Sequence, residues 1–240
     1  MFFKSLKKEI LISTLGLIVV TIFITTALGV SSIRTAGGTA EKATADVLRE
    51  QAKKSLIQIA ESAADRQDLL FERTRDDASN LASYTKNVYD NPSIFSTDGY
   101  WEFDTRVFKK DNRYLNKESD ISTIFIPNYV TIDAQVKRDI ELTANLDFIA
   151  PSVLASNPNT VAVYTIDKKG VARYFPNIIL GNVVPVEHST LDDPVYKQAT
   201  PQEDPEKKIV WSALYDDPAK RGLMITVSAP IYSKDGFESV

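Results

Sequence analysis

Apolar and polar positions follow different patterns in successive parts of the chain, and the first pattern is an uninterrupted apolar run. From Ile10 to Val30 no charged residue occurs. A helix of roughly 20 apolar residues is long enough to cross the ~30 Å hydrocarbon core of a bilayer. The Ser and Thr hydroxyls within the run can bond back to carbonyls of their own helix. The pattern therefore predicts a transmembrane helix over residues 10–30.

The charges that flank this run predict its orientation. Lys4, Lys7 and Lys8 precede it, whereas Arg34 stands nearly alone after it. Because Lys and Arg are retained on the cytoplasmic side, residues 1–9 are expected in the cytoplasm and the rest of the chain outside. A cleaved signal peptide is the alternative, since Ala27-Leu28-Gly29 loosely resembles a cleavage site. The apolar core of a signal peptide is typically ~7–15 residues, and this run is longer.

A second pattern, with helical period, extends from Ala40 to about Tyr89 without Gly or Pro. Gly37-Gly38 and Asn91-Pro92 bracket it, and Asn before Pro is disfavoured in a helix. The pattern predicts one amphipathic stalk helix over residues 38–90, roughly 75 Å long at 1.5 Å per residue. Its apolar stripe comprises Leu48, Ala52, Leu56, Ile59, Ala63, Leu70, Leu81, Tyr84 and Val88.

A lone helix of this length cannot bury its own stripe. We therefore expect the stalk to pair with a second copy of itself, forming a homodimer. A place in a monomeric bundle is the alternative. Residues 93–128 are aromatic and polar without a clear period, which predicts irregular structure. A second helix is predicted from Ile132 to Ala155, kinked at Pro151.

The third pattern consists of runs rich in β-branched and aromatic residues. Val161–Ile166 and Val171–Phe175 flank the turn Asp167–Gly170, which predicts a hairpin. Lys208–Tyr215 and Leu223–Tyr232 follow as further strands. Long helices followed by antiparallel strands predict an α+β fold, with residues 91–240 forming one module. A turn at residues 235–237 points to another strand, so the chain is expected to be a fragment of a longer protein.

Composition narrows the function classes. The 240 residues carry a net charge of −4, which argues against nucleic-acid binding. There is no cysteine and only one histidine, His188, so thiolate sites and two-histidine sites are excluded. His188 itself is expected on a surface loop. No nucleophile, phosphate-loop or metalloprotease motif occurs, so we expect no catalytic residue, no cofactor and no metal site.

Two segments carry a resemblance to a known family. They are VAVYTIDKKGVARYFP, and DDPVYKQA followed by KKIVWSALYDDPAKRGLMITVSAPIYSKDGF. With the N-terminal anchor and the long helix, they resemble double Cache sensor domains of bacterial and archaeal transmembrane receptors. Tyr215 and Asp217 fit the family's Tyr-x-Asp turn, and Thr226, Ser228 and Pro230 fit its Thr-x-Ser-x-Pro strand.

The resemblance implies a PAS-like module that senses small molecules. The protein would be anchored in the cell (inner) membrane, with this module on the extracytoplasmic side. Ligand binding would shift the long helix and signal across the membrane, as in chemoreceptors and sensor histidine kinases. This region would not be an enzyme, and a C-terminal output domain, such as a kinase, would be missing. A membrane-anchored adhesion or scaffolding protein with an external interaction domain is the alternative, and a membrane-anchored hydrolase is a third hypothesis.

The resemblance also implies a pocket with aromatic walls and carboxylate anchors. The candidate ligand-binding residues are Tyr174, Asp193, Tyr196, Trp211, Tyr215 and Asp217. Family members that bind amino acids or amines usually carry Arg and Trp just before the Tyr that corresponds to Tyr196, and this chain has neither. A cationic or neutral ligand is therefore expected rather than an amino acid. The alternative is that the aromatic residues are core and the two Asp residues only form turns.

Overall fold

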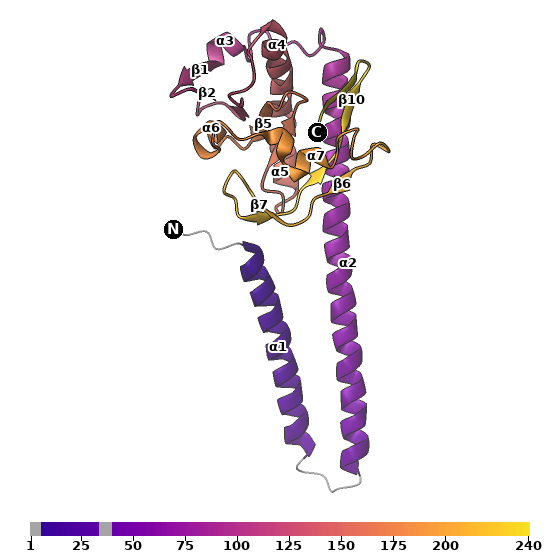
Figure 1. Cartoon of the computed structure of the whole chain (residues 1–240). Coiled ribbons are helices and arrows are strands. Elements are labelled where there is room, and N and C mark those ends of the chain that lie inside the picture. The colour runs from indigo at the N-terminus through magenta and orange to yellow at the C-terminus, as the bar shows by residue number, and fades with distance from the viewer. Residues whose placement is uncertain (1–5, 34–39) are drawn as a thin grey trace. The chain divides into compact units, whose positions relative to one another are not determined.

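The computed structural model describes residues 6–33 and 40–240, and the side chains of residues 14–27 and 47–240 (Figure 1). The chain divides into two compact units, residues 1–71 and residues 72–240. Helix α1 (Leu6–Ile33) and most of the long helix α2 (Ala40–Asp90) belong to the first unit. The second unit contains the end of α2 and all of the strands, so the fold is α+β, as predicted.

Helix α1 contains the uncharged run. Its described side chains, residues 14–27, are all exposed. The Thr21, Thr25 and Thr26 hydroxyls donate to carbonyl oxygens one turn earlier, at 2.6, 2.7 and 2.7 Å. This confirms the back-bonding expected from the sequence. Among the described residues, no helix is both long enough and apolar enough to cross a membrane.

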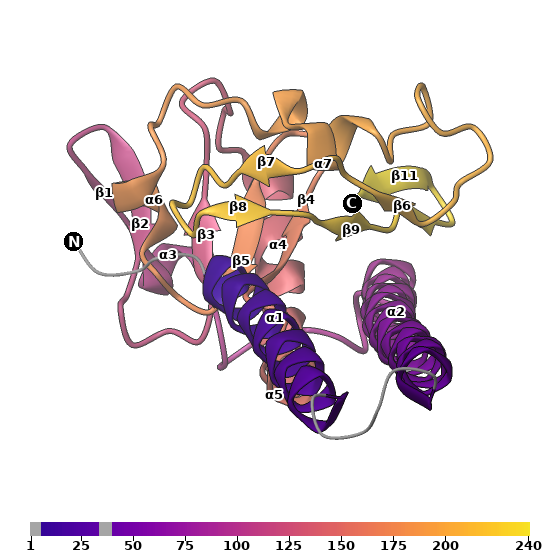
Figure 2. The same cartoon turned by 90° about the horizontal axis from the view of Figure 1, so that it is seen from below.

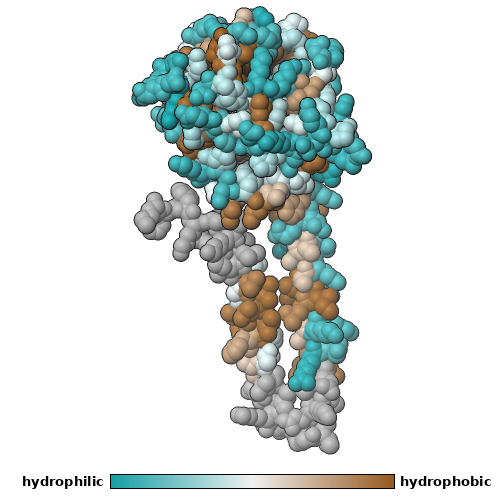
Figure 3. Space-filling view, in the orientation of Figure 1, coloured by the Kyte–Doolittle hydropathy of each residue, from teal (hydrophilic) through white to brown (hydrophobic). Residues whose placement is uncertain are grey.

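Helix α2 confirms the prediction of a long helix, because it runs without a break from Ala40 to Asp90. Within the first unit, every described α2 residue up to Leu69 is exposed, including the stripe residues from Leu48 to Ala63. Leu48, Leu56 and Ile59 are 39%, 38% and 46% exposed. Figure 3 shows apolar residues, in brown, on the surface of this helix. This part of the stripe is therefore solvent-facing in the single chain, whereas Val88, at the other end of the stripe, is buried in the second unit.

The core of the second unit is an antiparallel sheet. Strands β3 (Thr123–Phe125), β5 (Ala172–Phe175) and β4 (Val163–Ile166) pair in the order β3-β5-β4. The β4–β5 pair confirms the predicted hairpin. Ile166 and Val240 exchange two backbone hydrogen bonds of 2.9 Å, which places β11 (Gly236–Ser239) beside β4, and β11 in turn pairs with β10 (Ile231–Ser233) (Figure 2).

Helices cover one face of this sheet. Val136 and Ile140 of α4 (Ala134–Thr143) pack against Ile124, Ile126 and Trp101. The single kinked helix predicted for residues 132–155 was wrong in detail: α4 is followed by the 3-10 helix η1 (Ala144–Phe148) and then by α5 (Ala150–Ser156). Pro151 lies in the first turn of α5, where a missing N–H costs no helical hydrogen bond. The proline therefore begins a helix instead of kinking one.

Irregular structure for residues 93–128 was also a wrong prediction. This segment contains α3 (Phe103–Arg106), strand β3 and a hairpin of β1 (Val107–Lys110) and β2 (Arg113–Asn116). The hairpin turns at Asp111 and Asn112, whose φ angles are 48° and 60°. Two consecutive left-handed residues make the tight turn that matches the twist of paired strands, and Asp and Asn tolerate that conformation.

Short elements cover the other face of the sheet. They are α6 (Leu180–Val183), the 3-10 helix η2 (Thr190–Asp192), α7 (Pro194–Lys197), and the pairs β6 (Val210–Trp211) with β9 (Val227–Ser228) and β7 (Tyr215–Asp216) with β8 (Leu223–Met224). The long strands predicted here form only two-residue ladders. Their loops leave a space above the sheet.

Candidate ligand-binding site

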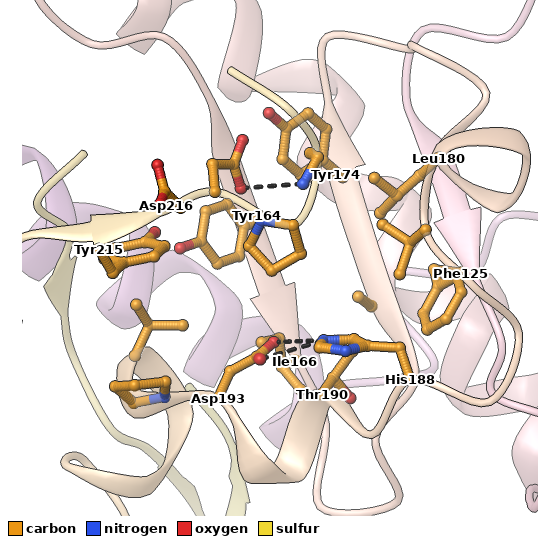
Figure 4. A pocket seen from close by; sticks show the side chains of 17 residues that line it. Phe125, Tyr164, Ile166, Tyr174, Leu180, His188, Thr190, Asp193, Tyr215 and Asp216 are labelled. Carbon is orange, nitrogen blue, oxygen red and sulfur yellow. Dashed lines mark hydrogen bonds and ion pairs between the residues drawn. The ribbon is translucent and has the colours of Figure 1, made fainter. Parts of the chain in front are cut away.

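A cavity of about 170 Å³ lies between the sheet face and the covering loops (Figure 4). An engineered apolar cavity of about 150 Å³ holds benzene, so this one can hold a small organic molecule. Its floor is formed by alternate residues of adjacent strands, and its rim by the segments before α7 and after β7. The lining residues are Phe125, Tyr164, Ile166, Ala172, Tyr174, Leu180, Val184, His188, Thr190, Asp193, Pro194, Val195, Tyr215, Asp216, Asp217, Pro218 and Ala219.

Three tyrosines form the aromatic wall. Tyr164 and Tyr174 are directly paired across β4 and β5, and their rings stack at 5.6 Å between centroids. The hydroxyls of Tyr164 and Tyr215 both contact the Thr226 hydroxyl, at 3.2 and 2.6 Å. Burial raises the pKa of Tyr174 to about 12 and raises those of Tyr164 and Tyr215. At neutral pH these phenols are therefore uncharged.

Asp193 faces His188 across the cavity rim. The His188 Nε2 atom lies 3.0 Å from each of the two Asp193 carboxylate oxygens (Figure 4). Burial raises the pKa of Asp193, and the hydrogen bond from His188 opposes that rise. Asp193 directly precedes α7, but its side chain makes no capping hydrogen bond to that helix. Its carboxylate is thus directed to the cavity side and not to its own backbone.

Asp217 is used differently. Its Oδ1 accepts a hydrogen bond from the Ala219 N–H at 3.1 Å, and its Oδ2 accepts one from the Arg221 N–H at 3.2 Å. These bonds organise the turn between β7 and β8. The turn-forming alternative raised from the sequence therefore describes Asp217, although the residue also lines the cavity.

The structure brings together four of the six residues predicted for the site: Tyr174, Asp193, Tyr215 and Asp217 all line the cavity. Tyr196 does not. It is buried in the core, and its ring meets Phe237 edge to face at 6.2 Å. Trp211 is also absent from the lining and lies on β6, paired with Val227 of β9. A ligand-binding role for the four cavity residues stays a prediction.

Sequence reasoning missed two residues that matter to the cavity. Tyr164 has a detectable signal, because it lies two residues before the inward-facing Ile166 on the same strand, and such residues share a face. His188 has none. It was expected on a surface loop, and it does lie in a loop, but its half-buried ring lines the cavity. Only the chain fold brings it to Asp193.

No model of a known protein family, no curated protein and no solved structure matches this chain. Among the described residues, no group of His, Cys, Asp or Glu side chains is arranged to hold a metal ion. What the structure defines is therefore a class: an α+β module with a small, aromatic-walled cavity beside its sheet, carrying one carboxylate that faces an imidazole.

Proposed function

We propose that this chain is the ligand-sensing region of a membrane receptor, of the double Cache type that its sequence resembles. The observation that carries the proposal is the cavity walled by Tyr164, Tyr174 and Tyr215, with Asp193 at its rim. It is large enough for a benzene-sized molecule, and its lining combines apolar walls with few polar groups, as in small-molecule sites. The uncharged run Ile10–Val30 supports a membrane anchor with a cytoplasmic N-terminus.

Helix α2 is the proposed path of the signal. Its last turns belong to the second unit, where Thr85 and Val88 are buried and Lys234 N–H donates to Asp90 Oδ1 at 2.7 Å. Nearer the N-terminal end of α2, the Thr74 hydroxyl accepts a hydrogen bond from the Asn157 side-chain amide at 3.0 Å. The same helix continues without a break to Ala40. A ligand that prefers one arrangement of the second unit would then bias the position of the helix.

The test is to block the cavity. Ala172 is buried in β5 and lines the cavity, so Ala172→Leu fills part of it. Ala213 is exposed near β7, and Ala213→Leu is the matched control. Purified chains of residues 1–240, kept in mild detergent, are screened by thermal shift against small amines, alcohols and carboxylates. We expect hits that are lost in Ala172→Leu and kept in Ala213→Leu.

Hits that bind both variants equally, or a complete lack of hits in the parent chain, contradict the proposal. The second outcome would favour the membrane-anchored adhesion or scaffolding protein. In that case the cavity would be only a packing defect of the loops. Circular dichroism of Ala172→Leu verifies that lost binding reflects a filled cavity and not a lost fold.

A further inference from the structure

The two carboxylates predicted as anchors are not equivalent. Both oxygens of Asp217 accept backbone hydrogen bonds from its own turn. Asp193 has no such role, since its side chain does not cap α7 and its partner is the His188 ring. A ligand group can replace a side chain at Asp193, whereas at Asp217 it would have to compete with the turn itself. Asp193 is the carboxylate that can change partner.

His188 stands where a ligand cation would stand. Its ring lies at the cavity wall, 6.4 Å from the Phe125 ring between centroids, and bonds both oxygens of Asp193. It belongs to a loop between α6 and η2, anchored locally by a hydrogen bond from its N–H to the Pro185 carbonyl at 3.0 Å. The imidazole and a ligand ammonium both donate hydrogen bonds to a carboxylate. Because the His188 Nε2 atom lies 3.0 Å from both Asp193 oxygens, an ammonium that takes the place between these two oxygens displaces the imidazole.

The rest of the lining favours a ligand with a single positive charge. The described residues that line the cavity include the carboxylates Asp193, Asp216 and Asp217 but no Lys or Arg, so the lining favours a cation over an anion. The faces of Tyr164, Tyr174 and Tyr215 suit an apolar or cationic group. The volume of about 170 Å³ limits the body of the ligand to roughly the size of a benzyl or butyl group.

We propose that the cavity binds a small monocationic amine, whose ammonium group replaces the His188 imidazole on the Asp193 carboxylate. The His188 side chain is thereby released, which makes this residue the internal competitor of the ligand. The inference rests on the proposed function, and it specifies the ligand class and the side chain that moves.

The competition depends on pH. Charged or titratable groups around Asp193 are His188, Asp192, Asp217 and Tyr215. Histidine side chains change charge between about pH 5 and 8, and a protonated imidazole holds a carboxylate more strongly. Amine binding should therefore weaken as pH falls. Protonation of Asp193 would act in the same direction, so the experiment must separate the two.

The probes are benzylammonium chloride and benzyl alcohol, which share a ring and differ in charge. They are titrated calorimetrically into the full 240-residue chain in detergent at pH 6 and pH 8. At pH 8 we expect benzylammonium to bind at least about tenfold more tightly than benzyl alcohol, because its hydrogen bond to the carboxylate is charge-assisted. At pH 6 its affinity should fall by about threefold to tenfold, and that of the alcohol should not change.

Three variants assign the effect. Asp193→Asn should remove the preference for the ammonium, and the matched Asp217→Asn should keep it. His188→Gln retains a hydrogen-bonding side chain that does not titrate, so it should abolish the loss of affinity at pH 6. If the loss persists in His188→Gln, Asp193 protonation is its cause and the competition is overturned. If Asp217→Asn loses the preference for the ammonium and Asp193→Asn keeps it, Asp193 is not the carboxylate that binds the ammonium.

His188 also reports on itself, because it is the only histidine in the sequence. In a chain purified without a histidine tag, its imidazole gives one assignable set of NMR signals. Benzylammonium should shift these signals, and benzyl alcohol should not. Unmoved signals at saturating benzylammonium contradict the proposal.

The outcomes also separate this inference from the proposed function. If both probes bind equally and Ala172→Leu blocks both, the result supports the cavity as a binding site and contradicts its specificity for amines. If neither probe binds at about 10 mM, amine recognition is excluded, because even a weak specific site has a Kd near 1 mM. The proposed function is then decided by the wider screen.

Discussion

At the scale of single residues, Asp167 shows how a buried carboxyl group links the fold to pH. It begins the turn between β4 and β5, where its Oδ1 accepts hydrogen bonds from the Lys169 and Val171 N–H groups, both at 2.8 Å. Burial raises the pKa of Asp167 from 3.8 to about 6, against the effect of these two bonds. The folded state therefore holds this proton more tightly than the unfolded state.

The first prediction follows from the sign of this shift. The stabilising contribution of Asp167 is fully present below about pH 4 and is lost as pH rises through about 6. Asp167→Asn keeps an oxygen that can accept both hydrogen bonds and has no charge to bury. We expect the variant to gain about 1–3 kcal/mol over the parent at pH 7.5, and to lose most of that gain at pH 4.

Denaturant unfolding at both pH values measures this difference. Asp235→Asn, an exposed carboxylate in the turn before β11, is the control and should shift little at either pH. A gain for Asp167→Asn that is the same at pH 4 and pH 7.5 would show that the Asp167 carboxyl does not titrate in this range.

The second prediction tests Asp217 as a turn former. Asp217→Ala removes the acceptor of two backbone N–H groups, from Ala219 and Arg221. We expect a loss of about 1–2 kcal/mol in the free energy of unfolding. Its neighbour Asp216 is exposed and supplies the control, with a change below about 0.5 kcal/mol on replacement by Ala. Equal losses for the two variants would argue against the turn role.

The sequence predicts candidate residues better than it predicts their use. Asp193 and Asp217 look alike as acidic residues near prolines, and only the backbone geometry shows that one is bonded to its own turn. His188 and Asp193 are five residues apart in irregular structure, where no period relates side-chain directions. Tyr196 and Trp211 share the aromatic character of a pocket wall, but aromatic side chains also fill cores. Tyr174 and Tyr196 are both buried in the same core cluster, and only the fold shows that Tyr174 lines the cavity and Tyr196 does not.

At the scale of elements, long patterns were predictable and short ones were not. Helix α2 has some fourteen turns of consistent period, so its bounds follow closely from Gly and Pro positions. The β4–β5 hairpin has alternating residues and a Gly with φ 89° in its turn. Strands β6 to β9 have two residues each, too few to show any period.

Arg173 shows why the helical face was hard to predict. It is a buried arginine in the central strand, donating to the Thr143 and Ser122 hydroxyls at 2.9 Å and to the Ile140 carbonyl at 2.8 Å. Its guanidinium lies 4.5 Å from the centre of the Trp101 ring, and burial lowers its pKa to about 10. A charged residue in a strand normally indicates a solvent-exposed face. Because Arg173 is buried instead, apolar and polar residues do not alternate regularly along β5.

The third prediction concerns the exposed stripe of α2. Leu48, Leu56 and Ile59 lie on one helical face and are exposed in the single chain, and a second copy of the chain is the partner expected to cover them. With cysteine at Leu56 or Ile59, mild oxidation of the full chain should give a disulfide-linked dimer. Cysteine at Lys54, on the opposite face, should crosslink at a rate lower by about fivefold or more.

The native chain has no cysteine, so each crosslink comes from the introduced residue alone. Crosslinking that is strongest at Lys53 or Lys54 would place the interface on the charged face. A crosslinked fraction that does not change when the total chain concentration is lowered indicates a specific dimer, because random collisions become rarer on dilution.

At the scale of the whole molecule, one sheet organises both the core and the candidate site. Alternate residues of the same strands point to opposite faces: Ile124 packs toward α4, and Phe125, next to it, lines the cavity. The helical face is filled, whereas the other face is covered by short elements that leave a cavity. The α+β class was predictable because it depends on element order. The cavity was not, because it depends on how loops without a period cover the sheet.

The fourth prediction concerns where these units lie in the cell. Lys4, Lys7 and Lys8 precede the uncharged run Ile10–Val30, so the N-terminus is expected in the cytoplasm and the cavity outside. Since the native chain contains no cysteine, single cysteines at Lys54 and Asp235 give labelling sites without background. Both side chains are exposed, one on α2 and one in the turn before β11.

A membrane-impermeant thiol reagent should label both sites in intact cells. A cysteine at Lys4 is the matched control and should react only after the cells are lysed. Equal labelling of all three positions in intact cells would mean that the reagent has entered, and the experiment is then repeated with a larger reagent. Labelling of Lys54→Cys and Asp235→Cys only after lysis contradicts the topology. A cavity on the cytoplasmic side would meet metabolites and not external molecules, so this result would also change the kind of ligand expected for the proposed sensor.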